Sequence, residues 1–202
     1  MDTAILITAF VTLFVVIDPI GLAPLFVALT QGMDARRRRA IGLRACLVAA
    51  VLLTVFGVFG EAVLDFIGIS MPAFRIAGGI LLFLTALDML FERRSKRREG
   101  QTHGHEDDPS VFPLAMPLIA GPGAMATMVL LAGAPDTPWQ NVLAVHLVML
   151  GVIALVFALM LAASLMERIL GPTGINVVTR LLGMLLAALS VQFVLDGLGA
   201  LA

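Results

Sequence analysis

Residues 16–24 read VIDPIGLAP and lie inside an apolar run that extends from Thr3 to Leu29. A carboxylate followed by proline and glycine interrupts this run at Asp18, near its middle. Proline removes one backbone hydrogen bond from a helix and glycine adds backbone freedom, so the stretch predicts a helix that breaks here. An interrupted helix in a long apolar run is typical of a membrane span that carries a binding site.

The composition of the whole chain agrees with a membrane environment. Of its 202 residues, 60% are apolar and 13% are charged, and the mean hydropathy is +1.04. A soluble domain is about half apolar and about a quarter charged, so this composition excludes a soluble enzyme, a nucleic-acid-binding module and a disordered linker. The formal net charge of −1 offers no basic field for nucleic acid.

Six apolar runs are long enough to cross a bilayer, which needs about 20 residues in a helix. They cover residues 3–29, 41–59, 71–91, 112–133, 140–166 and 175–198. The first is interrupted at Asp18, and the fourth contains the stretch LIAGPG at residues 118–123. The predicted fold is an all-α polytopic bundle of six transmembrane helices in which the first and fourth are broken.

Arginine clusters set the expected orientation of the bundle. Residues 36–39 are four consecutive arginines, and five bases lie within residues 93–98. Because basic loops stay in the cytoplasm, we expect loops 31–40 and 92–110 to be cytoplasmic and both termini to face outward.

The longest polar segment raises the question of a metal site. His103 and His105 stand beside three acids, and imidazoles with carboxylates can hold a metal. Histidines next to glycine in a flexible loop usually bind nothing tightly. We therefore interpret the segment as a linker and expect no metal.

The two halves of the chain carry matched residues, which predicts an internal repeat. The pairs are Pro19 with Pro122, Arg75 with Arg180, and Gly78 with Gly183. Their spacings are 103, 105 and 105 residues. The predicted units are a repeat over residues 1–91, a linker over 92–111 and a second repeat over 112–202. Since each unit has three spans, the second must be inverted, as in many secondary transporters. Chance similarity among apolar helices is the alternative.

The candidate substrate- or ion-binding residues lie at the two breaks and at the starts of the third spans. They are Asp18, Pro19, Gly21, Pro24, Arg75, Gly78, Gly79, Gly121, Pro122, Gly123, Thr127, Arg180 and Gly183. Half-helix N-termini favour an anionic group such as a carboxylate, and a carboxyl group inside a membrane is costly and often functional. The plainer interpretations are that the prolines only kink packed helices, that Asp18 only caps the helix after it, and that the arginines reach the interface.

The order and spacing of three motifs make the chain resemble the MarC family of bacterial and archaeal inner-membrane proteins. The motifs are DPIGLAPLF at residues 18–26, FRIAGGILLF at 74–83 and PLIAGPGA at 117–124. The resemblance covers essentially the whole chain. It implies a multi-pass protein of the inner membrane and a small neutral amino acid, such as alanine or glycine, as substrate.

The leading hypothesis is a secondary transporter for small neutral amino acids, with proton coupling at Asp18 as one option. A channel and a membrane protein without transport activity are the alternatives. The motifs of a Walker A ATPase, a zinc protease and a serine hydrolase are missing from the sequence, so we expect neither an enzyme nor a cofactor. Six spans fit a working monomer and a homodimer equally well.

Overall fold

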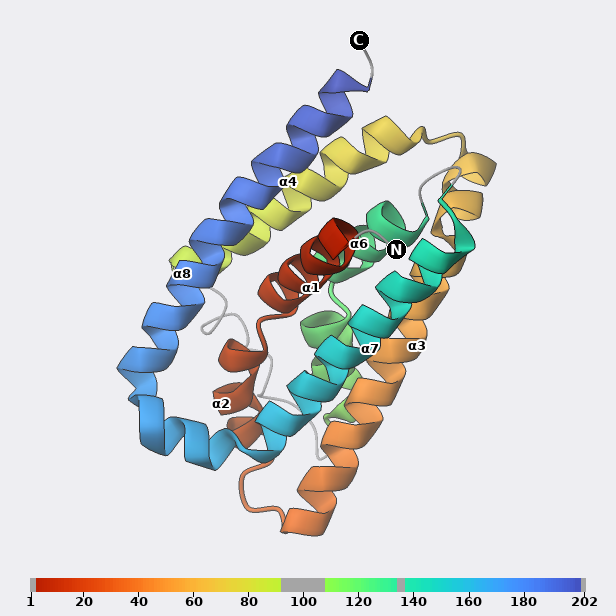
Figure 1. The fold of residues 1–202 in the computed structure, drawn as a ribbon. Helices are drawn as coiled ribbons and strands as arrows, with labels where there is room; N and C mark the ends of the chain where they lie inside the picture. Colours follow the sequence, from red (N-terminus) through yellow and green to blue (C-terminus); the bar gives the residue numbers. More distant parts are fainter. Residues whose placement is uncertain (1–2, 92–107, 134–136, 201–202) are drawn as a thin grey trace.

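The computed structural model describes residues 3–91, 108–133 and 137–200, and the described chain is helical throughout (Figure 1). The elements are α1 (Thr3–Ile17), α2 (Pro19–Leu29), α3 (Ala35–Ile67), α4 (Met71–Leu90), η1 (Ser110–Ile119), α6 (Pro122–Ala132), α7 (Trp139–Leu161) and α8 (Ala163–Gly199). The histidine-containing segment around His103 and His105 lies outside the described residues.

The helices match the predicted spans in number when the broken ones are joined. Five are long and apolar enough to cross a membrane, with α1 and α2 counted as one 25-residue span, Ile5–Leu29. The sixth is formed by η1 and α6, which meet at a bend of 56°. The all-α membrane bundle is therefore confirmed.

The second span is longer than the run 41–59 from which it was predicted. Asp34 accepts a 2.7 Å hydrogen bond from the N–H of Arg37 and so starts α3 before the arginines. Gly68, with a φ of 80°, ends the helix 33 residues later. The first-loop arginines at residues 36–39 are consequently helical.

The sequence predicts non-helical backbone near Asp18 to Gly21 and near Gly121 to Gly123, and the structure shows both breaks to be shorter than this. Only Asp18 leaves the helix, and Pro19 to Gly21 form the first turn of α2. Proline at the first position of a helix breaks nothing, because the N–H it lacks would have no partner there. In span four the break falls at Ala120 and Gly121, and Pro122 already begins α6.

The segment between the fifth and sixth spans is also more helical than predicted. The expected sixth span was 175–198, but α8 begins at Ala163. Gly171, with φ 64° and ψ 171°, interrupts it and separates a short helix from the long one.

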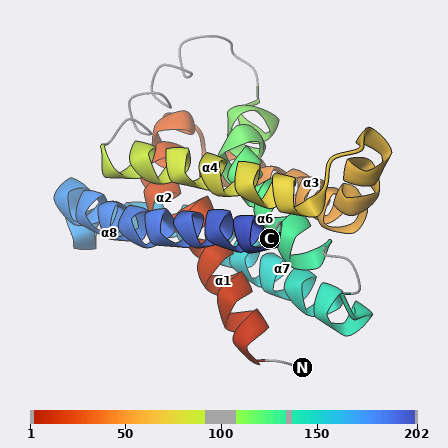
Figure 2. The ribbon, with the colours of Figure 1, turned by 90° about the horizontal axis from the view of Figure 1, so that it is seen from above.

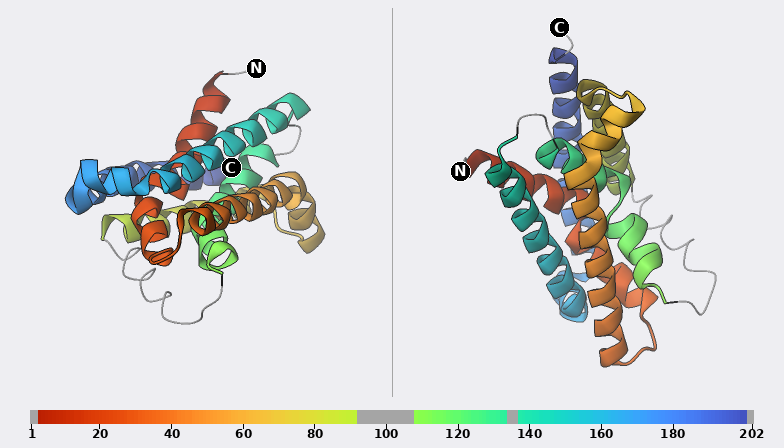
Figure 3. Two further views of the ribbon diagram at one scale, coloured as in Figure 1. Left: turned by 90° about the horizontal axis from the view of Figure 1, so that it is seen from below. Right: turned by 90° about the vertical axis from the view of Figure 1, so that its right-hand side faces the viewer.

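Two pairs of long helices enclose the broken ones. In Figure 1, α3 and α7 lie along one side and α4 and α8 along the other, with α1, α2, η1 and α6 between them. Figure 2 shows α4 and α8 side by side, and the right-hand view of Figure 3 shows the same for α3 and α7. Both breaks therefore lie inside the bundle.

Burial follows this arrangement. The core gathers buried side chains from the inner helices and the facing sides of the outer ones, including Leu13, Phe26 and Met149. Large apolar side chains in the middle of α3 remain exposed, such as Leu47 and Val51, at 58% and 62%. Water would disfavour such a surface, whereas lipid accommodates it.

We expect Gly79→Ala to separate α4 from α8. A Cβ atom at this position would lie 2.8 Å from the backbone oxygen of Ser190 and 3.2 Å from the backbone nitrogen of Val194. Overpacking against backbone typically lowers the free energy of unfolding by about 1–3 kcal/mol. Thermal unfolding in detergent, followed by size-exclusion chromatography, measures the loss. Gly151→Ala on α7 is the matched control, because no atom lies within 4 Å of its added Cβ; equal stability of the two variants would contradict the prediction.

Candidate functional site

The first break consists of one residue, Asp18, whose φ of 54° and ψ of 66° lie in the left-handed region. Asp tolerates this conformation better than most residues. Its Oδ1 accepts a 3.0 Å hydrogen bond from the N–H of Gly21, and the side chain is fully buried. The predicted capping of α2 by Asp18 is confirmed, and a buried carboxyl group lies where the span breaks.

The second break has no such carboxyl group. Gly121 adopts an extended conformation with φ −80° and ψ 168°, and no side chain caps α6. A Cβ at Gly121 would lie 2.5 Å from the backbone oxygen of Pro117, so this turn requires glycine. The start of α6 therefore presents N–H groups and the positive end of a helix dipole without a side-chain acceptor.

The two breaks lie beside each other in the bundle. A Cβ at Gly123, in the first turn of α6, would lie 3.3 Å from Cγ1 of Val16, two residues before Asp18. It would also lie 3.0 Å from Cδ2 of Leu82 and 3.7 Å from Oγ1 of Thr85, both on α4. The first turn of α6 thus lies against the end of α1 and the middle of α4.

The two halves carry different residues at the equivalent positions that precede the half-helices α2 and α6. Asp18 and Gly121 are 103 residues apart, the same spacing as the prolines that follow them. The first half-helix α2 is capped by its own carboxylate, whereas the second, α6, is not. By its chemistry, the uncapped start of α6 would suit a carboxylate, and the buried Asp18 would suit a positive charge or a proton.

The three glycines of the third spans have different surroundings. Gly78 packs on α6, where its Cβ would lie 3.3 Å from Leu130 and 3.4 Å from Ala126. Gly79 packs on α8 instead, and Gly183 packs on α4, with Cβ of Met89 at 3.0 Å. Gly78 therefore joins α4 to the helix that begins at the second break, whereas the other two hold the α4–α8 pair together.

The remaining candidates lie at varied distances from the breaks. Thr127 is fully buried and donates a 2.8 Å hydrogen bond to the backbone oxygen of Gly123. Pro24 is half-buried within α2. Arg75 is half-buried near the start of α4, whereas Arg180 is exposed on α8, so the matched arginines do not occupy matching environments.

Val16 and Thr85 were missed as neighbours of the second break. Thr85 lies seven residues after Gly78, which is two helical turns along the same face, and that spacing could have identified it. Its hydroxyl donates a 2.9 Å hydrogen bond to the backbone oxygen of Leu81. Val16 carries no sequence signal beyond its closeness to Asp18.

An ion pair fixes the far end of the broken fourth span. Arg44 on α3 pairs with Asp108, which precedes η1. The carboxylate of Asp108 also accepts a 3.1 Å hydrogen bond from the N–H of Ser110, the first residue of η1. These contacts anchor η1 to α3 on the side of the bundle where the first-loop arginines lie.

Comparison with known proteins gives consistent matches over the whole length. The profile described as MarC family integral membrane protein matches residues 3–202. A UPF0056 membrane protein of Methanocaldococcus jannaschii is 37% identical over 206 residues, covering 100% of both chains. The UPF0056 inner membrane protein YhgN of Escherichia coli is 37% identical over 194 residues, covering 96% of this chain and 95% of its own. A UPF0056 membrane protein of Aquifex aeolicus is also 37% identical, with 95% and 91% covered. No solved structure matches.

Proposed function

Because the chain belongs to the MarC family of integral membrane proteins, we propose that it is a secondary transporter of small neutral amino acids driven by a proton gradient. The chain is a multi-pass protein of the inner membrane, as its helices and its relatives indicate. One observation carries the transport proposal. Two half-helices, α2 and α6, begin next to each other inside the bundle, and one of them begins at a buried carboxyl group.

The proposed substrate fits the chemistry of the two breaks. A neutral amino acid carries a carboxylate and an ammonium group. The uncapped start of α6 suits the carboxylate, because its N–H groups and helix dipole favour negative charge. Asp18 suits the ammonium or a coupled proton, because a buried carboxylate is stabilised by a positive partner. The tight packing around Gly123 favours a substrate with a small side chain.

An inverted repeat is part of the proposal. The second spans α3 and α7 pack together, and so do the third spans α4 and α8. Gly79 contacts Ser190, and Gly183 contacts Ala86 and Met89. With the repeat spacing of 105 residues, Gly79 corresponds to position 184 and Ser190 to position 85. The observed contact of Gly183 with Ala86 differs from this expected pair by one residue at each position. Each half thus offers the other the same glycine contact, which supports two units related by a two-fold axis in the membrane plane.

Counterflow in proteoliposomes tests the transport proposal. Vesicles are loaded with unlabelled alanine, and the entry of labelled alanine is followed without any gradient. A carrier gives transient, saturable accumulation of label that glycine competes for. A channel gives fast flux that does not saturate, and a protein without transport activity gives no flux above empty vesicles. Either of the last two results contradicts the proposal.

A further inference from the structure

His146 is an ionisable residue inside a membrane span, and the transport function proposed above assigns no role to it. It lies on α7, seven residues after Trp139, the first residue of the helix. Its Nδ1 is 2.8 Å from the backbone oxygen of Val142. Because a carbonyl oxygen can only accept, Nδ1 carries the hydrogen, and the lone pair of the neutral ring is on Nε2.

The lone pair of Nε2 is enclosed where three helices meet. Nε2 is buried and has no hydrogen-bond partner among the described residues. A Cβ at Gly57 on α3 would lie 2.9 Å from Nε2 and 2.9 Å from Cε of Met128 on α6. Burying an acceptor without a donor is unfavourable, so the arrangement calls for a ligand that brings a hydrogen. The space on the Gly57 side of Nε2 does not admit even a methyl group, and a proton is the smallest ligand that fits this requirement.

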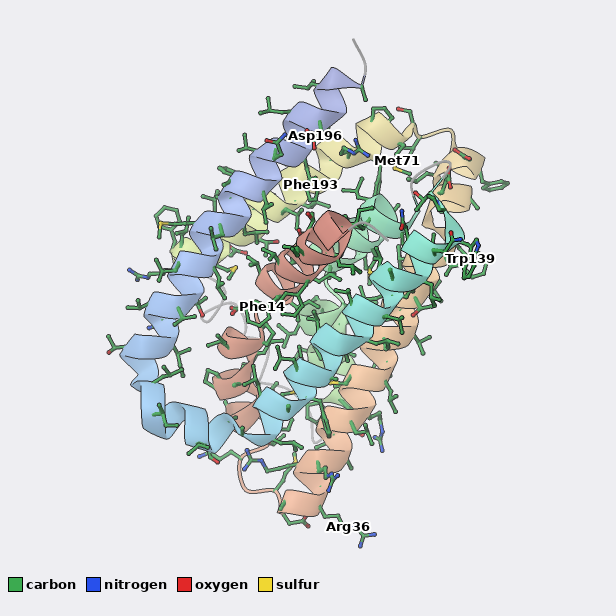
Figure 4. All side chains as sticks on the ribbon, viewed as in Figure 1. Phe14, Arg36, Met71, Trp139, Phe193 and Asp196 are labelled. Carbon is green, nitrogen blue, oxygen red and sulfur yellow. The ribbon has the colours of Figure 1, made fainter. Side chains whose placement is uncertain are left out.

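His146 lies between the outer end of the bundle and the breaks. Arg36 and Trp139 lie at opposite ends of the α3–α7 pair (Figure 4), so His146 belongs to the half away from the first-loop arginines. At 1.5 Å per residue it lies about 10 Å from the start of α7, and Met128 lies about 9 Å from the start of α6. Along these helices His146 is thus intermediate between the outer surface and the second break.

The ionisable groups around His146 are few. On α3, Glu61 is the only one within four residues of Gly57, and it is half-buried one turn further outward. The sequence of α6 contains no ionisable residue. The helices α1 and α2 also pack on α7, and neither contains an ionisable residue. The helix α8, which packs on α7 as well, carries Arg180 and Asp196. On the helices that meet at the ring, α3 and α6, Glu61 is the nearest ionisable residue along the chain.

We propose that Nε2 of His146 is the entry site for the proton that drives transport. The proton passes from outer water, by way of the Glu61 carboxylate, to the lone pair of Nε2, where a new N–H bond forms and the ring gains one positive charge. Release of that proton towards the breaks, with the Asp18 carboxylate as acceptor, restores the neutral ring. This assignment rests on the proposed transport function.

The test uses His146→Asn in the full chain. The asparagine amide keeps a donor for the Val142 oxygen but has no lone-pair nitrogen that takes a proton. Met128→Leu is the matched control, because it preserves the volume beside the ring. We expect the Asn variant to keep alanine counterflow within about twofold of wild type and to lose gradient-driven accumulation at least tenfold. The control should keep both. Wild-type accumulation by the Asn variant, or loss of its counterflow, would contradict the proposal.

A second measurement does not depend on transport. Carbon NMR of the labelled imidazole, with the His146 signal identified by its absence from the Asn variant, reports proton binding in the folded protein. The proposal requires a signal that shifts reversibly with pH. A signal that stays at the neutral-ring position until the protein unfolds would exclude proton binding, even if the protein transports amino acids. A shifting signal in a protein without counterflow would instead remove only the transport proposal.

Discussion

Asp18→Asn is expected to reduce gradient-driven accumulation of alanine at least tenfold while the protein inserts and folds normally. Asparagine and aspartate cap helices about equally well, so the hydrogen bond to the N–H of Gly21 is retained. The substitution removes only the ability to carry a negative charge and to take up a proton. Accumulation in proteoliposomes with an imposed proton gradient measures the effect.

The same substitution at Asp34 is the control. Asp34 also caps a helix, accepting a 2.7 Å hydrogen bond from the N–H of Arg37, but it is exposed. We expect Asp34→Asn to leave transport unchanged. If Asp18→Asn also accumulates alanine at the wild-type level, Asp18 is only a cap, and the broken backbone alone remains as the candidate site.

Gly121→Ala is expected to have the second large effect, a fall of at least tenfold in alanine counterflow. The added methyl group would lie 2.5 Å from the backbone oxygen of Pro117, and neither group belongs to a flexible side chain. The turn between η1 and α6 must then move, which displaces the first N–H groups of α6. Counterflow at saturating alanine, with the folded fraction determined by size-exclusion chromatography, measures the change.

Pro122→Ala provides the comparison for the second break. Pro122 is the exposed first residue of α6, where a helix needs neither a proline ring nor a bonded N–H. We expect a change of less than about threefold. A larger loss at Pro122 than at Gly121 would show that the proline, rather than the glycine, sets the geometry of the break.

The sequence predicted the spans well because their signal is local. Long apolar runs and the stretches at residues 18–21 and 121–123 identify six spans and two interruptions without knowledge of any contact. The extent of each interruption was less predictable. Pro19 and Pro122 are the first residues of helices and do not interrupt them. The non-helical residues are Asp18 and Gly121, which directly precede the two prolines.

What the sequence could not predict is which side chains meet. Val16 against Gly123, and His146 against Gly57, are contacts between helices that are far apart in the chain. Apolar periodicity indicates that one face of a helix is buried, but it does not identify the helix against which that face packs. The Asp34 cap extends α3 through its arginines, which lie outside the apolar run 41–59 that predicts the span.

The proposed carrier depends most on substrate reaching the junction of the two breaks, and a single cysteine at Val16 tests this most directly. Val16 contacts Gly123 and is 4% exposed, so in a Cys46→Ala background a thiol from Val16→Cys is shielded until the bundle opens. We predict slow modification by a small water-soluble thiol reagent in proteoliposomes, slowed at least fivefold further by saturating alanine. A thiol that reacts at the same rate with and without alanine, in protein that still catalyses counterflow, would place the substrate elsewhere and contradict the site.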